Sequence, residues 1–197
     1  MSKGQQTRKH IIQQAATLFN QRGYTGSSIS HVMEYTGLQK GGIYRHFESK
    51  EQLALAAFDY AQQQSTRRLI EAVVAETDAI QQLLAFITTS HALTLNPPVP
   101  GGCPILNTIV DSDDGDPVLF ERVVAVVTEW EQLIERIVVD GIARGSIRHN
   151  INPQAVSTLI IATLEGGILL AQAHQSAVYL QHTADHLVQY VQRDLAA

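Results

Sequence analysis

The sequence predicts an all-α fold in which a short N-terminal head precedes a longer helical body. Apolar residues recur at spacings of three and four through most of the chain, which is the period of one helix face. No segment sustains the alternation of apolar and polar residues that indicates a half-buried strand. The pairs Asp116-Pro117 and Asn152-Pro153 each place an N-cap residue before a proline at the first helical position, which is typical of a helix start.

Start and stop signals place the expected elements in order. Ser28 offers an N-cap to the second helix, which Gly37 closes, and Ser49 with Gln52 forms a capping-box pattern before the fourth. Residues 96–102 (NPPVPGG) are expected to form a loop. Helices are expected over about 7–22, 29–36, 43–47, 50–76, 78–95, a short stretch after 103, 117–144, 153–174 and 177–194.

Charge is divided unevenly along the chain. Residues 1–50 hold seven Lys or Arg and two Glu, a net charge of +5, whereas residues 51–197 hold seven Arg and seventeen acidic residues, a net charge of -10. A basic segment on an acidic remainder indicates a part that seeks phosphate and a part that repels it. Chance clustering of surface charge is the alternative explanation.

Residues 28–47 are predicted to form a helix-turn-helix motif, because two short helices flank a Gly37-Leu38 turn. Ile43 and Phe47 lie one turn apart and are expected to anchor the second helix to the core of the head. The rest of that helix supplies hydrogen-bond donors, a close backbone approach and an aromatic hydroxyl, as a recognition helix needs. The residues are Gln39, Lys40, Gly41, Gly42, Tyr44, Arg45 and His46.

Residues 7–60 resemble the DNA-binding region of the TetR family of transcription regulators. The resemblance rests on RGY at 22–24, GL at 37–38, KGGIYRHF at 40–47 and SKE at 49–51. It implies a one-component repressor that binds a palindromic DNA operator as a dimer and is released by a small-molecule or electrophile effector. It also implies a DNA-binding domain over 1–50 and a ligand-sensing and dimerisation domain over 51–197. A DNA-binding protein without a ligand, acting as an architectural or partner-regulated factor, is the alternative within the same class.

The resemblance implies contacts with the DNA backbone, and two of them have an alternative. Ser28 would cap its helix and offer its hydroxyl to a phosphate, while Tyr44 would bond a phosphate or pack on a thymine methyl. For Tyr44 and His46 the alternative is packing within the head. The residues expected near the backbone are Ser28, Lys40, Gly41, Tyr44, His46 and Lys50.

Gln39 and Arg45 are the candidates for reading bases, because Gln suits adenine and Arg suits guanine, each worth about 1–3 kcal/mol when bidentate. Gln39 also stands where the family usually has Ser or Thr, so the recognition helix lacks a good cap. Gly42 stands where a side chain is common, which costs roughly 1 kcal/mol of helix propensity. We therefore expect a recognition helix that becomes firmer on DNA.

The last two expected helices, 153–174 and 177–194, are predicted to form the interface of a homodimer. Residues 159–171 are apolar nearly all round, and small residues among them allow a second helix to approach. The final helix carries Leu180, Ala184, Leu187, Val191 and Leu195 at helical spacing. Burial of these residues inside a single chain is the alternative to a four-helix interface.

The effector site is less clearly marked. Cys103 follows two glycines and precedes Asn107, a Gly-Cys pattern that resembles one branch of the family, in some members of which a cysteine here senses electrophiles or oxidants. A packing cysteine is the simpler interpretation. Glu165 lies in the most apolar helix and needs either a ligand or an Arg across the interface as its partner. Phe86, His91 and Trp130 are expected to line a pocket or to belong to the core.

Other functional classes find little support in the sequence. Walker, dinucleotide-binding and HExxH motifs are missing, so a helical enzyme is not favoured and no cofactor is expected. His182 and His186 share a helix face, with His174 upstream, but no cysteine or carboxylate completes a metal site there. The N-terminus has no apolar signal core and no run is as long as a membrane span, so we expect a cytoplasmic protein that does not enter the membrane.

Overall fold

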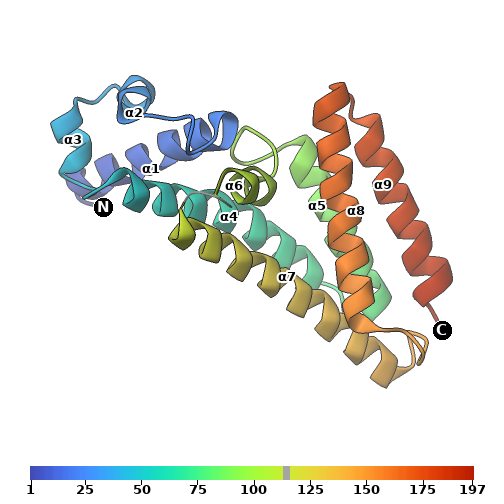
Figure 1. Ribbon diagram of the computed structural model, residues 1–197. Coiled ribbons are helices and arrows are strands. Elements are labelled where there is room, and N and C mark those ends of the chain that lie inside the picture. Colours follow the sequence, from blue (N-terminus) through green and yellow to red (C-terminus); the bar gives the residue numbers. More distant parts are fainter. Residues whose placement is uncertain (113–115) are drawn as a thin grey trace. The chain divides into compact units, whose positions relative to one another are not determined.

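A computed structural model describes residues 1–112 and 116–197, and the regular elements in these ranges are helices (Figure 1). The predicted all-α class is confirmed. The helices are α1 (Lys3–Arg22), α2 (Ile29–Thr36), α3 (Lys40–Tyr44), α4 (Lys50–Val74), α5 (Ala79–Leu95), α6 (Pro104–Ser112), α7 (Pro117–Arg144), α8 (Pro153–His174) and α9 (Val178–Tyr190), followed by the π-helical turn η1 (Val191–Leu195).

Helix boundaries follow local capping chemistry, and two starts differ from the expectation. α3 spans Lys40–Tyr44 rather than residues 43–47, so Phe47 lies just beyond it. α1 begins at Lys3 rather than near residue 7, because Ser2 and Gln5 cap it reciprocally: Gln5 N donates to Ser2 Oγ at 3.3 Å and Ser2 N donates to Gln5 Oε1 at 2.8 Å. The capping box expected at Ser49 is only half formed. Gln52 N donates to Ser49 Oγ at 3.2 Å, but Gln52 Oε1 accepts from Glu48 N.

The described chain divides into two compact units. Unit 1 comprises Met1–Gln64 and Pro97–Ala125, and unit 2 comprises Ser65–Asn96 and Val126–Ala197. α4 and α7 therefore each contribute to both units. The functional boundary expected between residues 50 and 51 stays a prediction.

Unit 1 is organised around an apolar cluster beneath α1, α2 and α3. Both predicted anchors of the recognition helix belong to it, because Ile43 is 1% and Phe47 2% exposed. The cluster also takes in a residue of the 96–102 loop, Val99, so this loop packs with the N-terminal helices. Its buried members are Ile11, Ala15, Ala16, Leu18, Val32, Ile43, Phe47, Leu53, Ala57, Ala61 and Val99.

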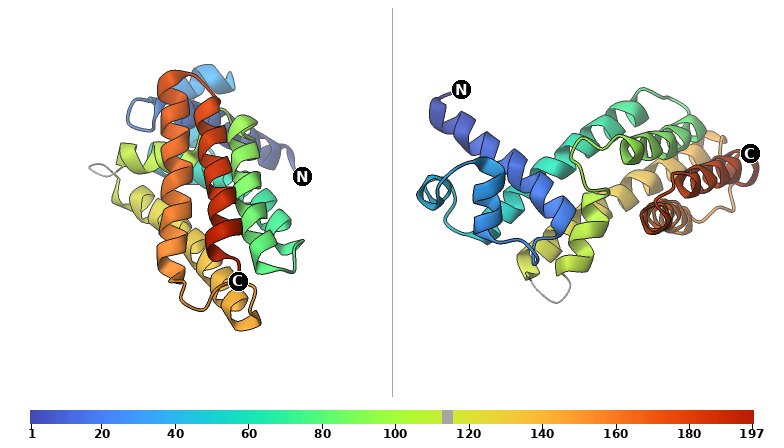
Figure 2. Two further views of the ribbon diagram at one scale, coloured as in Figure 1. Left: turned by 90° about the vertical axis from the view of Figure 1, so that its right-hand side faces the viewer. Right: turned by 90° about the horizontal axis from the view of Figure 1, so that it is seen from above.

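In unit 2, α8 and α9 pack side by side and both contact α5 (Figure 2). Here one expectation is wrong: the apolar stripe of the last helix does not face outward toward a partner. Leu187, Val191 and Leu195 are fully buried in the chain's own core, and Leu180 and Ala184 are 6% and 5% exposed. Helical spacing identifies a buried face, but it does not say whether the same chain or another one covers it.

α8 keeps an outward apolar face. Leu159, Leu169 and Leu170 are 40%, 57% and 43% exposed, and Gly166 would meet nothing within 4 Å if it carried a Cβ. Within the described residues, α8 is long and apolar enough to cross a membrane by length and composition alone. Its most apolar stretch of 18 residues has a mean hydropathy of 1.6, and 28% of that stretch is buried inside the chain. A helix that must be covered by a second protein surface has the same composition.

Candidate nucleic-acid interface

The predicted recognition helix is α3, a single turn and a half that exposes most of its polar residues. Its N-cap, Gln39, makes no side-chain capping bond, as the sequence predicts, so the first turn rests on the backbone bonds from Gly42 N and Ile43 N to Gln39 O, at 2.8 and 3.3 Å. Gly42 is half-buried, and a Cβ there would lie 3.7 Å from Leu38 Cβ. The exposed residues are Gln39, Lys40, Gly41, Tyr44 and Arg45, with His46 half-buried.

Lys40 and Tyr44 form one surface on α3 because they lie one turn apart. The ammonium of Lys40 lies 5.7 Å from the centroid of the Tyr44 ring, and Tyr44 is 39% exposed. The pair presents a cation and a phenolic hydroxyl in the same direction. At Gly41 an added Cβ would meet nothing within 4 Å, so the surface beside this pair is open.

Ser28 caps α2 in a reciprocal pair that the sequence pattern did not reveal. His31 N donates to Ser28 Oγ at 3.3 Å, and Ser28 N bonds to His31 Nδ1 at 3.2 Å. His31 replaces the Glu or Gln of the usual capping box. Because Ser28 Oγ acts as an acceptor in this bond, its own hydrogen can be donated to an anion at the exposed N-terminus of α2.

Lys50, expected to bind the DNA backbone, is held by a residue that sequence reasoning missed. Its Nζ donates to the carbonyl oxygen of Tyr24 at 2.7 Å and lies 4.1 Å from the centroid of the Tyr24 ring. Burial lowers the pKa of Lys50, partly offset by Glu51 and Asp111. The Tyr24 hydroxyl donates to Glu51 Oε1 at 3.1 Å, and burial followed by the Glu51 charge raises the pKa of Tyr24. One ammonium N–H is thus used and two remain for a phosphate.

The cations of residues 1–50 make no ion pair in the described structure. The ion pairs in the described ranges are Arg67–Glu71 at 2.8 Å and Arg122–Asp59 at 2.6 Å, both outside this segment. The net charge of +5 on residues 1–50 is therefore not tied up in ion pairs with described acidic side chains. Such a surface attracts a polyanion and releases its counterions.

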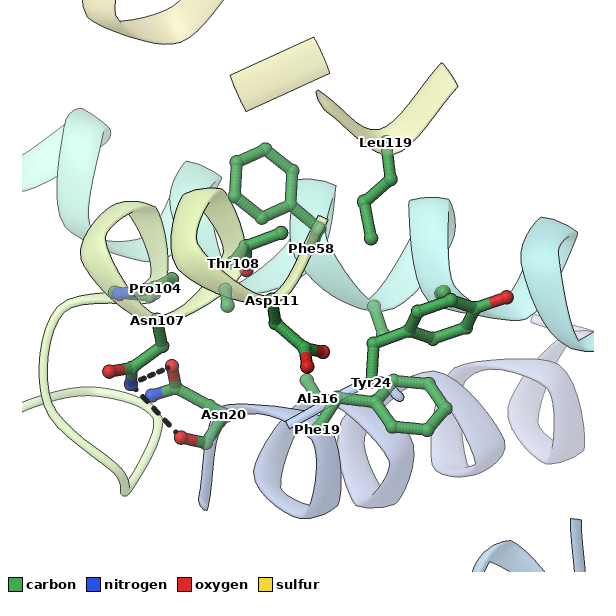
Figure 3. Close-up of a pocket in the computed structure, with 13 residues that line it drawn as sticks. Ala16, Phe19, Asn20, Tyr24, Phe58, Pro104, Asn107, Thr108, Asp111 and Leu119 are labelled. Atoms are coloured by element: carbon green, nitrogen blue, oxygen red, sulfur yellow. Dashed lines mark hydrogen bonds between the residues drawn. The ribbon is translucent and has the colours of Figure 1, made fainter. Parts of the chain in front are cut away.

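Asn107, predicted as an effector contact, ties α6 to the end of α1 (Figure 3). Its Nδ2 lies 3.0 Å from Asn20 O, 3.0 Å from Asn20 Oδ1 and 2.7 Å from Gly101 O. Asn20 Nδ2 in turn donates to the carbonyls of Pro100 and Gly102, at 3.0 and 3.2 Å. The last carbonyls of a helix lack partners within the helix, so Asn107 acts as a remote cap of α1.

One turn further along α6, Asp111 makes a second connection within unit 1. Thr25 N donates to Asp111 Oδ2 at 2.8 Å, and Thr25 Oγ1 donates to Asp111 O at 3.3 Å. Between these two connections lies a cavity of about 20 Å³, lined in part by Phe19, Tyr24 and Thr108. This volume holds about one water molecule and is too small for an effector.

The other effector candidates are distributed over the two units. Cys103 is half-buried directly before α6, where Asn107 N donates to its carbonyl oxygen at 3.1 Å. In unit 2, Phe86 and Trp130 meet edge to face with centroids 6.2 Å apart, and Phe86 is 1% exposed in the core. Trp130 Nε1 is buried with no hydrogen-bond partner within the described residues. His91 on α5 and Glu165 on α8 are half-buried.

Comparison with known proteins gives matches along the whole chain. Residues 11–57 match the family model of bacterial regulatory proteins, tetR family, and residues 79–187 match the tetracyclin repressor-like C-terminal domain. A TetR transcriptional regulator from Chloroflexus aurantiacus J-10-FL has a crystal structure with a TM-score of 0.95 and 47% identity, covering 100% of this chain and 99% of that chain.

Two further relatives carry informative names. The HTH-type transcriptional repressor DhaR of Mycobacterium sp. (strain GP1) is 28% identical over 166 residues, 82% of this chain and 80% of DhaR. A cysteine mutant of the TetR family regulator CifR, complexed with 26-bp double-strand operator DNA, shares the fold with a TM-score of 0.81 at 20% identity, covering 92% of this chain and 94% of that chain.

Proposed function

Because the chain belongs to the TetR family of transcriptional regulators, we propose that it is a one-component repressor that binds a palindromic operator as a dimer and leaves it when a small molecule or electrophile is sensed. Proteins of this family are DNA-binding regulators and not enzymes. The exposed cationic surface of α3, which no acidic side chain neutralises, is the observation that carries the proposal.

The proposed contacts divide between backbone and bases. Lys40 and Tyr44, displayed together, suit a phosphate, as do the Ser28 hydroxyl and the two remaining donors of Lys50. His46 and the backbone at Gly41 are proposed to lie against the same strand. Gln39 and Arg45 are exposed and their side chains make no hydrogen bond to other described residues, so both can reach base edges in the major groove.

Dimerisation is proposed through α8 and α9, with α8 supplying the apolar contact. Its exposed leucines flank Gly166, where a partner helix can approach closely. Two copies of a helix-turn-helix related by a two-fold axis then read two half-sites. A cytoplasmic location follows from this proposal, since the operator lies there.

Sensing is proposed to act through the start of α6. An adduct on Cys103, formed when its thiolate attacks an electrophile, would enlarge a half-buried side chain immediately before α6. Asn107 lies one turn away and holds the end of α1, so a shift of α6 strains the bonds to Asn20. For a non-covalent effector, Phe86, His91, Trp130 and Glu165 of unit 2 are the proposed lining. The role of repressor is supported by the name of DhaR.

A mobility-shift titration tests the DNA-binding half of the proposal. The probe is a duplex that the purified protein selects from a random-sequence library, and the variant is Tyr44→Ala combined with Lys50→Ala. We expect the double variant to lose at least tenfold in affinity, because each side chain contributes a backbone contact. Arg67→Gln, on the exposed surface of α4 in unit 2, is the control and should bind as the wild type does. Equal affinity of the double variant and the wild type would contradict the proposal.

A second titration tests sensing. N-ethylmaleimide is added to the bound complex of the wild type and of Cys103→Ser. Release of the wild type alone would establish sensing by Cys103, since it is the only cysteine. Trp130 is the only tryptophan of the chain. A small molecule that releases the protein from DNA and also quenches the fluorescence of Trp130 would therefore indicate an effector site in unit 2. If neither alkylation nor a panel of small molecules releases the DNA, the alternative of a regulator without a ligand is favoured.

A further inference from the structure

Arg8 in α1 is a surface cation that lies over a buried aromatic ring. Its guanidinium carbon lies 4.9 Å from the centroid of the Phe47 ring, and Phe47 is 2% exposed in the core of the head. Phe47 follows the recognition helix directly, three residues after Tyr44. Arg8 is itself exposed. Its charge is therefore held at the end of the recognition helix by a residue that is fixed in the core.

Arg8 makes no ion pair with a described residue, although Glu48 directly follows Phe47 in the sequence. α1 carries Lys3, Arg8, Lys9 and Arg22, and the first acidic residue of the chain is Glu34. The side chain of Arg8 takes part in no ion pair and no hydrogen bond with the described residues. The described partner of its side chain is the Phe47 ring, over which the guanidinium carbon lies.

A guanidinium held over a ring by a cation–π contact spends none of its N–H groups on hydrogen bonds to a carboxylate or carbonyl. Five donors in a rigid fork match the geometry of a phosphate, and stacking reduces the side-chain freedom that binding would otherwise remove. The guanidinium of Arg8 is thus available to an oxyanion at Phe47, three residues after Tyr44.

We propose that Arg8 is a further contact with the DNA backbone, which binds a phosphate next to the one reached from the recognition helix. This inference rests on the proposed operator binding. It adds a contact from α1, upstream of the segment that matches the family's DNA-binding region at 11–57. A phosphate contact does not distinguish between bases, so it should strengthen binding to every DNA sequence equally.

The salt dependence of binding distinguishes a phosphate contact from a packing role. The slope of log K against log salt changes by about 0.9 for each phosphate contact. Arg8→Gln is expected to reduce the slope by about 0.9 per subunit, or about 1.8 for a dimer. Between 50 and 200 mM NaCl the wild type should then lose about 12-fold more affinity than Arg8→Gln.

The experiment measures fluorescence anisotropy with the selected operator and with a mixed-sequence duplex, using full-length protein. Arg8→Gln should weaken both duplexes by a similar factor. Arg8→Lys keeps the charge and should keep the wild-type slope. Arg67→Gln, which removes an ion-paired cation of unit 2, should leave the slope unchanged.

Two results would overturn the inference. An unchanged slope in Arg8→Gln, even with weaker binding, would assign Arg8 to packing against Phe47. A slope in Arg8→Lys as low as that in Arg8→Gln would show that the stacked geometry and not the charge is responsible. Failure of the wild type to select and bind any duplex would instead contradict the proposed function.

Discussion

Replacing Asn107 by aspartate is expected to destabilise the protein more than truncating it to alanine, although aspartate is nearly the same size. The Nδ2 group of Asn107 faces three oxygens at 2.7–3.0 Å, two of Asn20 and one of Gly101. An amide nitrogen supplies two N–H groups, each worth about 0.5–1.5 kcal/mol net when bonded. Asn107→Ala should therefore lower the free energy of unfolding by about 1–3 kcal/mol.

Asn107→Asp loses the same bonds and adds a repulsion. The new carboxylate would face three oxygens that can only accept, so roughly 1–3 kcal/mol more should be lost. Protonation would supply one donor, which raises the pKa of the new side chain in the folded state. A raised folded pKa means that stability is retained at low pH and lost as the pH rises through that pKa. The difference between the two variants should therefore shrink as the pH falls through that raised pKa, and the recovery should be complete below about pH 4.

Urea unfolding followed by far-ultraviolet circular dichroism, at one fixed protein concentration, measures these differences. Asn150 is exposed and makes no described side-chain hydrogen bond, so Asn150→Asp is the matched control and should change stability by less than about 0.5 kcal/mol. An Asn107→Asp variant as stable as Asn107→Ala at neutral pH would refute the remote cap of α1.

Three further predictions concern glycine, pH and assembly. In urea unfolding, Gly101→Ala should lower the free energy of unfolding by roughly 3 kcal/mol and Gly37→Ala by roughly 1 kcal/mol. Both glycines have a positive φ (122° and 70°), but only a Cβ at Gly101 would meet a backbone oxygen, that of Asn20 at 2.5 Å. Equal losses would contradict the packing of the 96–102 loop against α1. Hydrogen bonds from its own backbone and from Ser49 lower the pKa of Glu51. Glu51 therefore contributes less than about 1 kcal/mol to the free energy of unfolding at this exposed site, and this contribution is present above pH ~4.3 and disappears as the pH falls through the lowered pKa. Urea unfolding of Glu51→Gln at several pH values should lack this acid-dependent contribution, and a pH profile equal to that of the wild type would argue against it. Gly166→Arg should yield monomers in sedimentation experiments, since its position is open within the chain, whereas the control Val139→Arg on α7 should not; a dimeric Gly166→Arg would argue against α8 as the interface.

Short-range signals in the sequence predicted the helices well. Asn152 caps α8 through bonds to Gln154 N and Ala155 N, and Ser28 caps α2, as their positions indicated. The missing cap at Gln39 was also predicted. In each case the interacting atoms lie within three residues of each other, so the chemistry of the segment decides the outcome. The Ser2 and Gln5 box was equally local and could have been found by the same pattern.

Long-range contacts could not be predicted in this way. Asn107 and Asn20 lie 87 residues apart, and nothing in either segment indicates a remote cap. Tyr24 holds Lys50 across 26 residues. The stripe of α9 shows the same limit, because its spacing predicts burial correctly but the neighbours that bury it are α5 and α8 of the same chain. Pairings of this kind depend on the packing of whole helices, which periodicity does not determine.

The absence of ion pairs among the described cations of residues 1–50 has an energetic consequence for binding. An ion pair on the surface adds at most about 1 kcal/mol to stability, so the segment gives up little by leaving its cations without acidic partners. If they were paired, each pair would have to be broken before a phosphate could bind, and that cost would subtract from affinity. Aromatic rings fix Arg8, Lys40 and Lys50 instead, at 4.9, 5.7 and 4.1 Å from the ring centroids. A ring restrains a cation without neutralising it, so these charges are positioned and still available to DNA.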